Sequence, residues 1–290
     1  MKALRRICLM PNRQKDPELR VTREAARLLT DSGAEVFVLA PLSEEELFSE
    51  CRIAQKVPPE TDCLVVIGGD GSILDATETA ISEQIPLLGV NLGHLGFLAE
   101  LPPQELPLLT RLTRGEYRLS ERMMLSLSLE RAGETTRCPR YSLNEIAITH
   151  KENFGMADLF LTDTDGNRIR YRGDGLIIAT PSGSTAYSFS CGGPVIHSDL
   201  AAICVTPICP HSFFNRAMLL PPDAVIRVTN NARSRDALLV GIDGRNTYVL
   251  APGNCISVGR AEKTLQMISF ENHGTMNTLR QKMQDAELKE

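Results

Sequence analysis

Apolar runs and helical periods alternate along the first hundred residues. Four runs, at 7–10, 35–40, 63–67 and 86–90, consist almost entirely of large apolar residues and predict buried strands. Between these runs, residues 18–32 and 72–83 carry apolar side chains at helical spacing. Continuous apolar strands separated by helices are typical of a sheet that is covered on both faces. This part of the chain therefore predicts an α/β domain with a mostly parallel sheet.

The pattern changes after the proline pair Pro102-Pro103. Leu125, Leu127 and Leu129 alternate with polar residues, which is the period of a strand with one buried face. Asp165-Gly166 joins the segments 159–162 and 168–171, and Asp243-Gly244 lies between the segments 238–242 and 248–250, as the turn of a β-hairpin does. Almost nothing from 104 to 265 has a helical period, so we expect an all-β domain there.

The pattern thus predicts two domains. Residues 1–103 form the α/β domain and residues 104–265 form the β-rich domain. The last segment regains a helical composition from Asn277 onward. We expect residues 266–290 to pack back on the first domain.

Composition narrows the class of protein without assigning a function. The 290 residues have a formal net charge of −5 and 42% hydrophobic content, which argues against a nucleic-acid binder or a protein held by anionic lipid. No apolar run approaches the length of a membrane span. The eight cysteines include no CxxC pair, which favours reduced thiols in a cytoplasmic protein over disulfides or a zinc site.

The strongest local motif is the turn Gly68-Gly69-Asp70-Gly71-Ser72, which joins a predicted strand to a predicted helix. Glycines allow a close backbone approach, and backbone N–H groups at a helix N-terminus bind phosphate. A carboxylate in such a turn suits a metal or a substrate hydroxyl. The alternative is a tight turn in which Asp70 only caps the helix.

Two further segments carry polar groups at strand ends. Residues 89–97 contain Gly93-His94-Leu95-Gly96-Phe97, a crevice loop in which Phe97 is a candidate pocket ring and His94 orients the loop. Asn144-Glu145 pairs an amide with a carboxylate, which suits ribose hydroxyls. The alternative for this pair is a solvated strand end.

The longest motif surrounds a predicted strand at 176–179. Arg172 and Asp174 precede this strand, and a hydroxyl-rich glycine turn follows it. The side chains that can hydrogen-bond to a phosphate or base, or stack on a ring, are Thr185, Tyr187 and Ser190. Ser184 does not lie in a GxSxG hydrolase motif. This segment therefore favours nucleotide binding over hydrolysis.

Taken in order, these segments resemble the NAD kinase family. The matching segments are GGDGS at 68–72, GHLGF at 93–97, NE at 144–145, RGDGLIIATPSGSTAYSFSCGGP at 172–194, PH at 210–211 and DG at 243–244. The resemblance implies a Rossmann-like N-terminal domain, a β-rich C-terminal domain and a homodimer or homotetramer. It also implies transfer of the ATP γ-phosphate to the 2′-hydroxyl of the adenosine ribose of NAD, with a divalent metal, expected to be Mg²⁺.

The same resemblance assigns roles to residues. It makes Asp70 the base for the 2′-hydroxyl, Gly71 a phosphate contact through its backbone, and Asn144 and Glu145 contacts to NAD near the ribose. The other residues that it places in the dinucleotide site are Arg172, Asp174, Thr185, Ala186, Tyr187, Ser188, Phe189 and Ser190. Three more positions are assigned as additional contacts: Phe97, Ser182 and Arg245. No residue is assigned as a metal ligand.

Two other functions remain open from the sequence. GGDG also occurs in diacylglycerol and sphingosine kinases, so a lipid kinase is the first alternative. A protein that senses NAD(P) without catalysis is the second. We expect small-molecule substrates, with no nucleic acid and no membrane as partners.

Overall fold

The computed structural model describes residues 1–39, 51–93, 96–99, 101–131, 134–150, 155–211, 215–270 and 275–287. The chain divides into two compact units. The first comprises Met1–Glu121 and Leu265–Glu290, and the second comprises Arg122–Thr264.

The first unit is built on a seven-stranded sheet in the order β3-β2-β1-β4-β5-β19-β6. Its strands are β1 (Arg6–Pro11), β2 (Glu35–Leu39), β3 (Arg52–Ala54), β4 (Cys63–Gly68), β5 (Leu87–Asn91), β6 (Arg118–Arg122) and β19 (Leu265–Ser269). β1 pairs in parallel with β2 and β4, and β4 pairs in parallel with β5. The apolar runs thus form the mostly parallel sheet that the sequence predicts.

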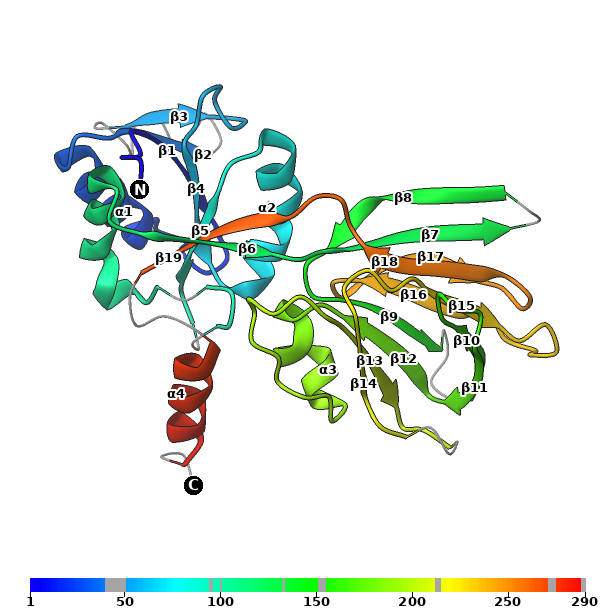
Figure 1. Ribbon diagram of the computed structural model, residues 1–290. Coiled ribbons are helices and arrows are strands. Elements are labelled where there is room, and N and C mark those ends of the chain that lie inside the picture. The colour runs from blue at the N-terminus through cyan, green and yellow to red at the C-terminus, as the bar shows by residue number, and fades with distance from the viewer. Residues whose placement is uncertain are drawn as a thin grey trace. The chain divides into compact units, whose positions relative to one another are not determined.

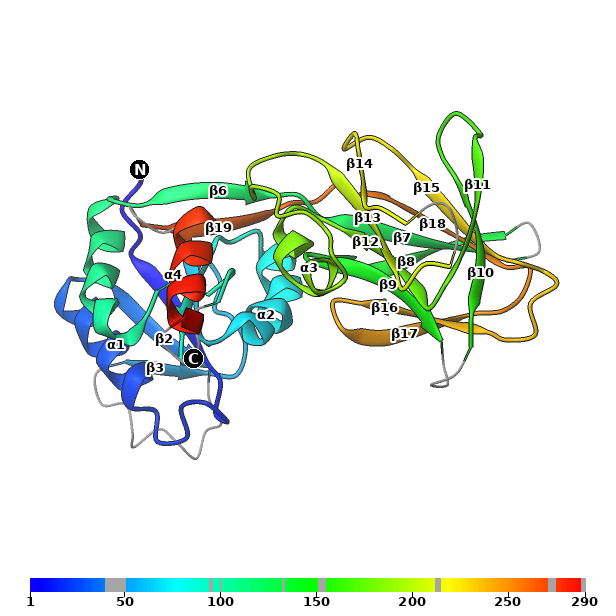
Figure 2. The ribbon, with the colours of Figure 1, turned by 90° about the horizontal axis from the view of Figure 1, so that it is seen from below.

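Helices cover both faces of this sheet (Figure 1 and Figure 2). Helix α1 (Arg20–Asp31) buries Ala25, Ala26 and Leu29 in the main core cluster on one face. Helix α2 (Asp70–Glu83) lies on the other face and buries Ile73 and Ala76. Coverage on both faces explains why every residue of β4 is buried. Helix α4 (Thr275–Glu287) completes this unit.

The first unit extends beyond the predicted boundary at residue 103. Residues 103–114 form the 3-10 helix η2 (Pro103–Arg114), although the sequence pattern predicts no helix there. Leu106, Leu109 and Leu112 recur every third residue and are fully buried in the core cluster of α1. A repeat of three is the period of a 3-10 helix, and the prolines at 103 and 107 obscure its helical character in the sequence. The compact units therefore meet at 121/122 and 264/265, where the sequence predicts 103/104 and 265/266.

The second unit consists of two six-stranded antiparallel sheets. One has the order β11-β10-β15-β18-β7-β8 and the other β14-β13-β12-β9-β16-β17. The strands of the first sheet are β7 (Leu125–Arg131), β8 (Glu134–Ser142), β10 (Ala157–Thr162), β11 (Arg168–Gly173), β15 (Ile226–Asn230) and β18 (Cys255–Arg260). Those of the second are β9 (Glu145–His150), β12 (Gly175–Ala179), β13 (Ile203–Ile208), β14 (Met218–Leu220), β16 (Leu238–Ile242) and β17 (Arg245–Leu250).

The two sheets share one core. Leu127 and Leu129 of β7, in one sheet, belong to the same apolar cluster as Leu176 and Ile178 of β12, in the other. The outer face of β12 carries a second cluster with Ile177. This outer face also contacts η3 (Ser182–Thr185) and α3 (Tyr187–Ser190). Burial from both sides explains the continuous apolar run of β12.

Both predicted hairpins are present. β10 pairs with β11 around Asp165-Gly166, and β16 pairs with β17 around Asp243-Gly244. Asp243 and Gly244 have φ of 49° and 76°, as the two central residues of a type I′ turn require. Among the helices that the structure describes, none has the length and apolarity to cross a bilayer.

Candidate active site

The glycine turn of the first unit is closely packed at Gly68 and open at Gly71. A Cβ on Gly68 would lie 2.3 Å from Ser72 Oγ, and that hydroxyl accepts a hydrogen bond from Asn12 Nδ2 at 2.7 Å. Gly71 has open space where a Cβ would lie. In the first turn of α2, which begins at Asp70, the Ser72 N–H donates to the Gly69 carbonyl at 2.9 Å, whereas the N–H groups of Asp70 and Gly71 have no preceding helical carbonyl to donate to. The turn therefore presents N–H groups and the positive end of a helix at an exposed position.

Asp70 uses its carboxylate to hold the second glycine segment. Oδ1 accepts the N–H groups of Leu98 at 3.1 Å and Ala99 at 2.9 Å, and Oδ2 accepts that of Phe97 at 3.0 Å. A Cβ on Gly96 would lie 2.0 Å from Asp70 Oδ1, so only glycine permits this approach. A carboxylate offers about four acceptor positions. Described residues use three of them, which leaves one, on Oδ2, that no residue in the described ranges fills.

Lys15 places a cation over the same turn. A Cβ on Gly69 would lie 2.4 Å from Lys15 Nζ, and one on Gly93 would lie 3.9 Å from it. Lys15 is exposed. It lies in the turn that follows β1, and this turn meets the glycine turn that follows the parallel neighbour β4. A cation beside the N-terminus of α2 raises the local positive potential, which favours an anion between them.

The second unit holds Asn144 and Glu145 in a rigid frame. The Asn144 carbonyl accepts the Thr180 N–H at 2.8 Å, and Thr180 Oγ1 donates to the Leu143 carbonyl at 2.5 Å. A Cβ on Gly183 would lie 2.0 Å from the Asn144 carbonyl oxygen. The segment 142–145 thus packs against the 180–183 turn on one side.

Asp243 contacts the segment 142–145 on the opposite side. Its Oδ1 accepts hydrogen bonds from Ser142 Oγ at 2.7 Å, Asn144 N at 2.8 Å and Glu145 N at 3.0 Å. Its Oδ2 accepts Leu143 N at 2.9 Å. All four donors come from one consecutive segment, about a hundred residues earlier in the chain.

Two polar atoms in this frame lack a partner among the described residues. Asn144 and Glu145 are 8% and 6% exposed. Asn144 Oδ1 and Glu145 Oε2 are buried and accept no hydrogen bond from any residue that the structure describes. Buried polar atoms are normally hydrogen-bonded. This pair is therefore not a solvated strand end, and its geometry suits a ligand that brings hydrogen-bond donors.

Burial also changes the acidity of Glu145. Loss of solvent is the main cause that raises the pKa of its carboxyl to about 7, and the nearby charge of Asp243 raises the pKa further. A hydrogen bond from the Tyr187 backbone opposes this shift. Burial likewise raises the pKa of Asp243, against its four hydrogen bonds. Two adjacent carboxylates therefore disfavour each other's ionised form.

Glu145→Gln is expected to stabilise the protein at alkaline pH. The folded-state pKa of about 7 exceeds the ordinary value of 4.5, so the unfolded chain ionises first and the folded state loses stability as pH rises through this window. A neutral glutamine avoids that loss. The gain in unfolding free energy should grow from under about 1 kcal/mol at pH 5 to about 3 kcal/mol at pH 8. Thermal unfolding at both pH values measures it.

The matched control is Glu262→Gln. A hydrogen bond from Tyr141 is the main cause that lowers the pKa of the exposed Glu262 carboxyl to about 2. Its ionised form therefore stabilises the fold above the ordinary pKa, so this variant should lose stability at pH 8. Equal changes in melting temperature at pH 5 and pH 8 for Glu145→Gln would contradict the assigned burial cost.

The segment 182–190 divides its side chains between the interior and the surface. Ser188 is fully buried, and its hydroxyl lies 2.7 Å from Thr206 Oγ1. Ser182 is buried as well, and its carbonyl accepts the Thr185 hydroxyl at 3.3 Å. The residues at the surface or partly exposed are Thr185, Ala186, Tyr187, Phe189 and Ser190. The side chains of Ser182 and Ser188 are thus enclosed in the fold, whereas the five residues at the surface or partly exposed remain accessible.

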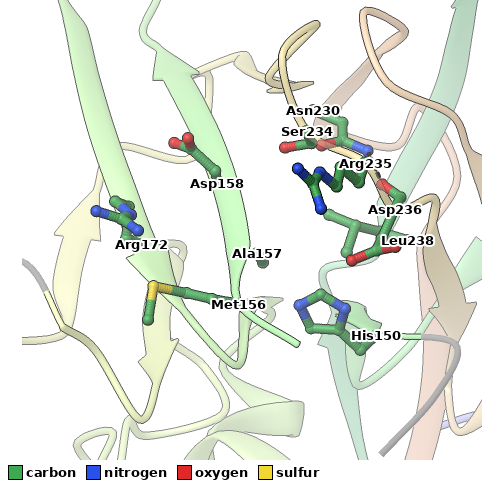
Figure 3. Close-up of a pocket in the computed structure, with 10 residues that line it drawn as sticks. All are labelled: His150, Met156, Ala157, Asp158, Arg172, Asn230, Ser234, Arg235, Asp236 and Leu238. Carbon is green, nitrogen blue, oxygen red and sulfur yellow. Dashed lines mark hydrogen bonds between the residues drawn. The ribbon is translucent and has the colours of Figure 1, made fainter. Parts of the chain in front are cut away.

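Arg172 lines a pocket that lies away from Asn144 and Glu145 (Figure 3). The cavity measures about 220 Å³. Its lining residues are His150, Met156, Ala157, Asp158, Arg172, Asn230, Ser234, Arg235, Asp236 and Leu238. β9 pairs Glu145 with Ala179 and Thr149 with Gly175, so this pocket and Asn144-Glu145 lie at opposite ends of the β9–β12 ladder, roughly 13 Å apart at ~3.3 Å per residue. The structure does not bring Arg172 to that pair.

Asp174 directly precedes β12, at the end of the ladder where the Arg172 pocket lies, but its charge still acts on Tyr187 of α3. It is exposed, and it accepts a hydrogen bond from the Cys209 thiol, which raises the pKa of that thiol. Burial is the main cause that raises the pKa of Tyr187, and the charges of Asp174 and Glu145 both add to the shift. The Tyr187 phenol is therefore within electrostatic range of both carboxylates.

The remaining predicted contacts lie in different places. Phe97, in the first unit, is half-buried, and Lys282 of α4 lies 5.0 Å from the centre of its ring. Arg245 is exposed at the start of β17. His94 lies outside the described residues.

Two family models match the chain. The model of the ATP-NAD kinase N-terminal domain matches residues 7–117, and that of the ATP-NAD kinase C-terminal domain matches residues 143–270. The chain belongs to the NAD kinase family. The NAD kinase of Caldanaerobacter subterraneus is 34% identical over 285 residues, which cover 97% of this chain and 99% of that protein. The NAD kinase of Geobacter sulfurreducens is 38% identical over 252 residues, covering 84% and 88% of the two chains.

Solved structures of NAD kinases share the fold. Yeast NADH kinase complexed with NADH has a TM-score of 0.77 and 26% identity, and the match covers 93% of this chain and 84% of that chain. The Archaeoglobus fulgidus NAD kinase in complex with ATP has a TM-score of 0.68 and 25% identity, with 95% and 98% covered. This chain of the NAD kinase family is a phosphotransferase, and these matches give no support to a lipid kinase.

Sequence reasoning misses two residues of this candidate site. Lys15 lies in a polar stretch after β1 with no motif around it, so nothing local distinguishes it from a solvated lysine. At Asp243, the DG motif indicates a hairpin turn and belongs to the family resemblance, but neither assigns a role to the aspartate. The available signal is the aspartate of a type I′ Asp-Gly turn, whose short side chain can bond to nearby backbone.

Proposed function

We propose that the chain transfers the γ-phosphate of ATP to the 2′-hydroxyl of the adenosine ribose of NAD and so forms NADP. The observation that carries this proposal is the pair of buried oxygens on Asn144 and Glu145, which no described residue satisfies. A ribose brings hydroxyl donors, and such donors would satisfy both atoms. The family matches support the same acceptor.

Asp70 is proposed to receive the 2′-hydroxyl proton. Three backbone N–H groups fix its carboxylate, and the remaining acceptor position on Oδ2 is available for a hydroxyl. In a loose phosphoryl-transfer transition state, the nucleophile loses its proton late, so alignment provides most of the rate enhancement. A carboxylate held by three donors is well suited to that alignment.

Phosphate binding is proposed at the N-terminus of α2. The backbone N–H of Gly71 and the ammonium of Lys15 supply positive potential there. Mg²⁺ is usually held by substrate phosphates, water and one or two carboxylates, and it neutralises phosphate charge. Within the described ranges, no group of three or more His, Cys, Asp or Glu side chains could hold a metal. Mg²⁺ would therefore arrive bound to the ATP phosphates, and the open acceptor position of Asp70 would remain for the hydroxyl.

Lys15→Gln tests the phosphate site. We expect the KM for ATP to rise about tenfold, because a hydrogen bond to a charged group contributes roughly 1.5 to 3 kcal/mol. The KM for NAD should stay within about twofold. Steady-state kinetics with each substrate varied measures both constants. Lys56→Gln, at another exposed lysine of the same unit, is the control, and an unchanged KM for ATP in Lys15→Gln would remove the lysine from the site.

Incubation of the chain with ATP, Mg²⁺ and NAD, followed by chromatography, tests the function. NADP should form with Mg²⁺ and disappear when EDTA is added. Parallel reactions with a diacylglycerol and a sphingoid base as acceptors should give no product. NAD binding by calorimetry with no NADP at any metal concentration would instead indicate a sensor without catalysis, and a phosphorylated lipid would indicate a lipid kinase.

We also propose that the enzyme works in the cytoplasm and forms a homodimer or homotetramer. All eight cysteines are free, which supports a reducing compartment such as the cytoplasm. The family resemblance supports a homodimer or homotetramer, and light scattering of the purified chain tests the oligomeric state.

A further inference from the structure

Asp243 combines three unusual features in one turn. It has a left-handed φ of 49°, which few non-glycine residues adopt. Its carboxylate accepts four hydrogen bonds, yet none of these comes from a cationic side chain.

The four donors identify what the carboxylate holds. Ser142 donates through its hydroxyl, and Leu143, Asn144 and Glu145 donate through consecutive backbone N–H groups. The Asp243 N–H in turn donates to the Glu145 carbonyl at 3.0 Å. The backbone of the pair is therefore bonded through both its N–H and its carbonyl groups, and its side chains are left to project elsewhere.

From this geometry we propose that Asp243 is a positioning residue for NAD binding. It fixes the backbone of Asn144 and Glu145 so that Asn144 Oδ1 and Glu145 Oε2 remain ready for the substrate. This inference rests on the proposed function and adds to it a residue that touches no substrate. The 180–183 turn forms the opposite wall of the same frame.

The charge of Asp243 has a second consequence. The titratable group whose charge acts on the Glu145 carboxyl is Asp243, and the Tyr187 backbone donates to that carboxyl from α3. The Tyr187 phenol is within electrostatic range of Glu145 as well. On the adjacent strands, Ala179 pairs with Glu145 and Ile242 pairs with the next residue of β9, and neither carries a charge. Removal of the Asp243 charge should therefore lower the pKa of Glu145.

Asp243→Asn is the test. The asparagine oxygen can keep the three hydrogen bonds now made to Oδ1, but its NH₂ group would face the Leu143 N–H, donor against donor. We expect the KM and the Kd for NAD to rise at least about tenfold, with the KM for ATP within about twofold. The pH midpoint at which NAD binding weakens on acidification should move lower.

Asp163→Asn is the matched control. Asp163 also accepts backbone N–H groups in a hairpin, from Asp165 at 3.0 Å and Asn167 at 2.8 Å, but these bonds lie at the surface. This variant should change neither substrate constant. A purely structural role of Asp243 would lower the melting temperature, shift both KM values together and leave the pH midpoint in place, which would overturn the proposal.

A second variant and a binding measurement on the wild-type chain complete the test. If Asp243→Asn does not fold, Ser142→Ala removes one donor and no backbone contact, and it should raise the Kd for NAD about threefold. An unchanged Kd would reject the proposal. If the wild-type chain binds NAD without forming NADP, the proposed function fails, while calorimetry still tests the role of Asp243. If the wild-type chain does not bind NAD, both fail.

Discussion

Asp70→Asn is expected to lose about 10²- to 10⁴-fold in kcat while it keeps NAD binding. An amide in place of Oδ2 turns the one open acceptor position of the side chain into a donor, so the 2′-hydroxyl loses the group that orients it and receives its proton. The oxygen of the amide can retain the N–H groups of Leu98 and Ala99. Steady-state kinetics with calorimetry of NAD binding measures both effects.

Asp62→Asn separates loss of chemistry from loss of structure. Asp62 also accepts two backbone N–H groups, from Arg5 at 2.8 Å and Arg6 at 2.9 Å, in the same unit. It lies outside the glycine turn, so its variant should retain full turnover. Wild-type turnover in Asp70→Asn would show that another group accepts the proton. A loss of NAD affinity as large as the loss of kcat would show that Asp70 acts through the 96–99 segment alone.

Gly183→Ala is expected to have the second largest effect. The added Cβ would lie 2.0 Å from the Asn144 carbonyl oxygen and 2.4 Å from its carbonyl carbon. That backbone cannot yield, because it is bonded to Thr180 on one side and to Asp243 on the other. Overpacking of this kind costs about 3 kcal/mol, which lowers the melting temperature by roughly 10 °C.

The same substitution should raise the KM for NAD more than about tenfold, because it displaces Asn144 directly. Calorimetric melting and kinetics measure the two effects. Gly259→Ala is the control in the same unit, since its Cβ would have Val225 Cγ2 as nearest neighbour at 3.4 Å, an ordinary contact. If Gly183→Ala behaved like Gly259→Ala, the rigid frame around Asn144 would be disproved.

Local patterns predict the fold wherever one period dominates. The apolar runs of β1, β2, β4 and β5 and the two Asp-Gly turns each carry their signal within a few residues. The leucines of η2 give a weaker signal, because they span only two intervals of three and Pro107 interrupts the segment. The domain boundary moves with them, since burial against α1 decides which unit those leucines join.

The candidate site is predictable in composition and less so in arrangement. Asn144 and Glu145 are identifiable as a pair, but their burial depends on Thr180, Gly183 and Asp243, which reach them from other segments. Arg172 stands near Asp174 in the sequence, yet it faces a different pocket. The register of β9 on β12 sets the separation of that pocket from Asn144 and Glu145, and the motif alone does not encode this register.

The order of residues by itself determined the parallel α/β half, the β-rich half and the set of polar motifs, because hydrophobic period and glycine turns act over short distances. Only the tertiary structure decided how those motifs are used. It showed the Asp70 carboxylate bonded to the 97–99 backbone, Lys15 over the glycine turn and Asp243 beside the backbone of Asn144 and Glu145. Hydrogen bonds and burial between distant segments depend on packing in three dimensions, and no local pattern encodes them.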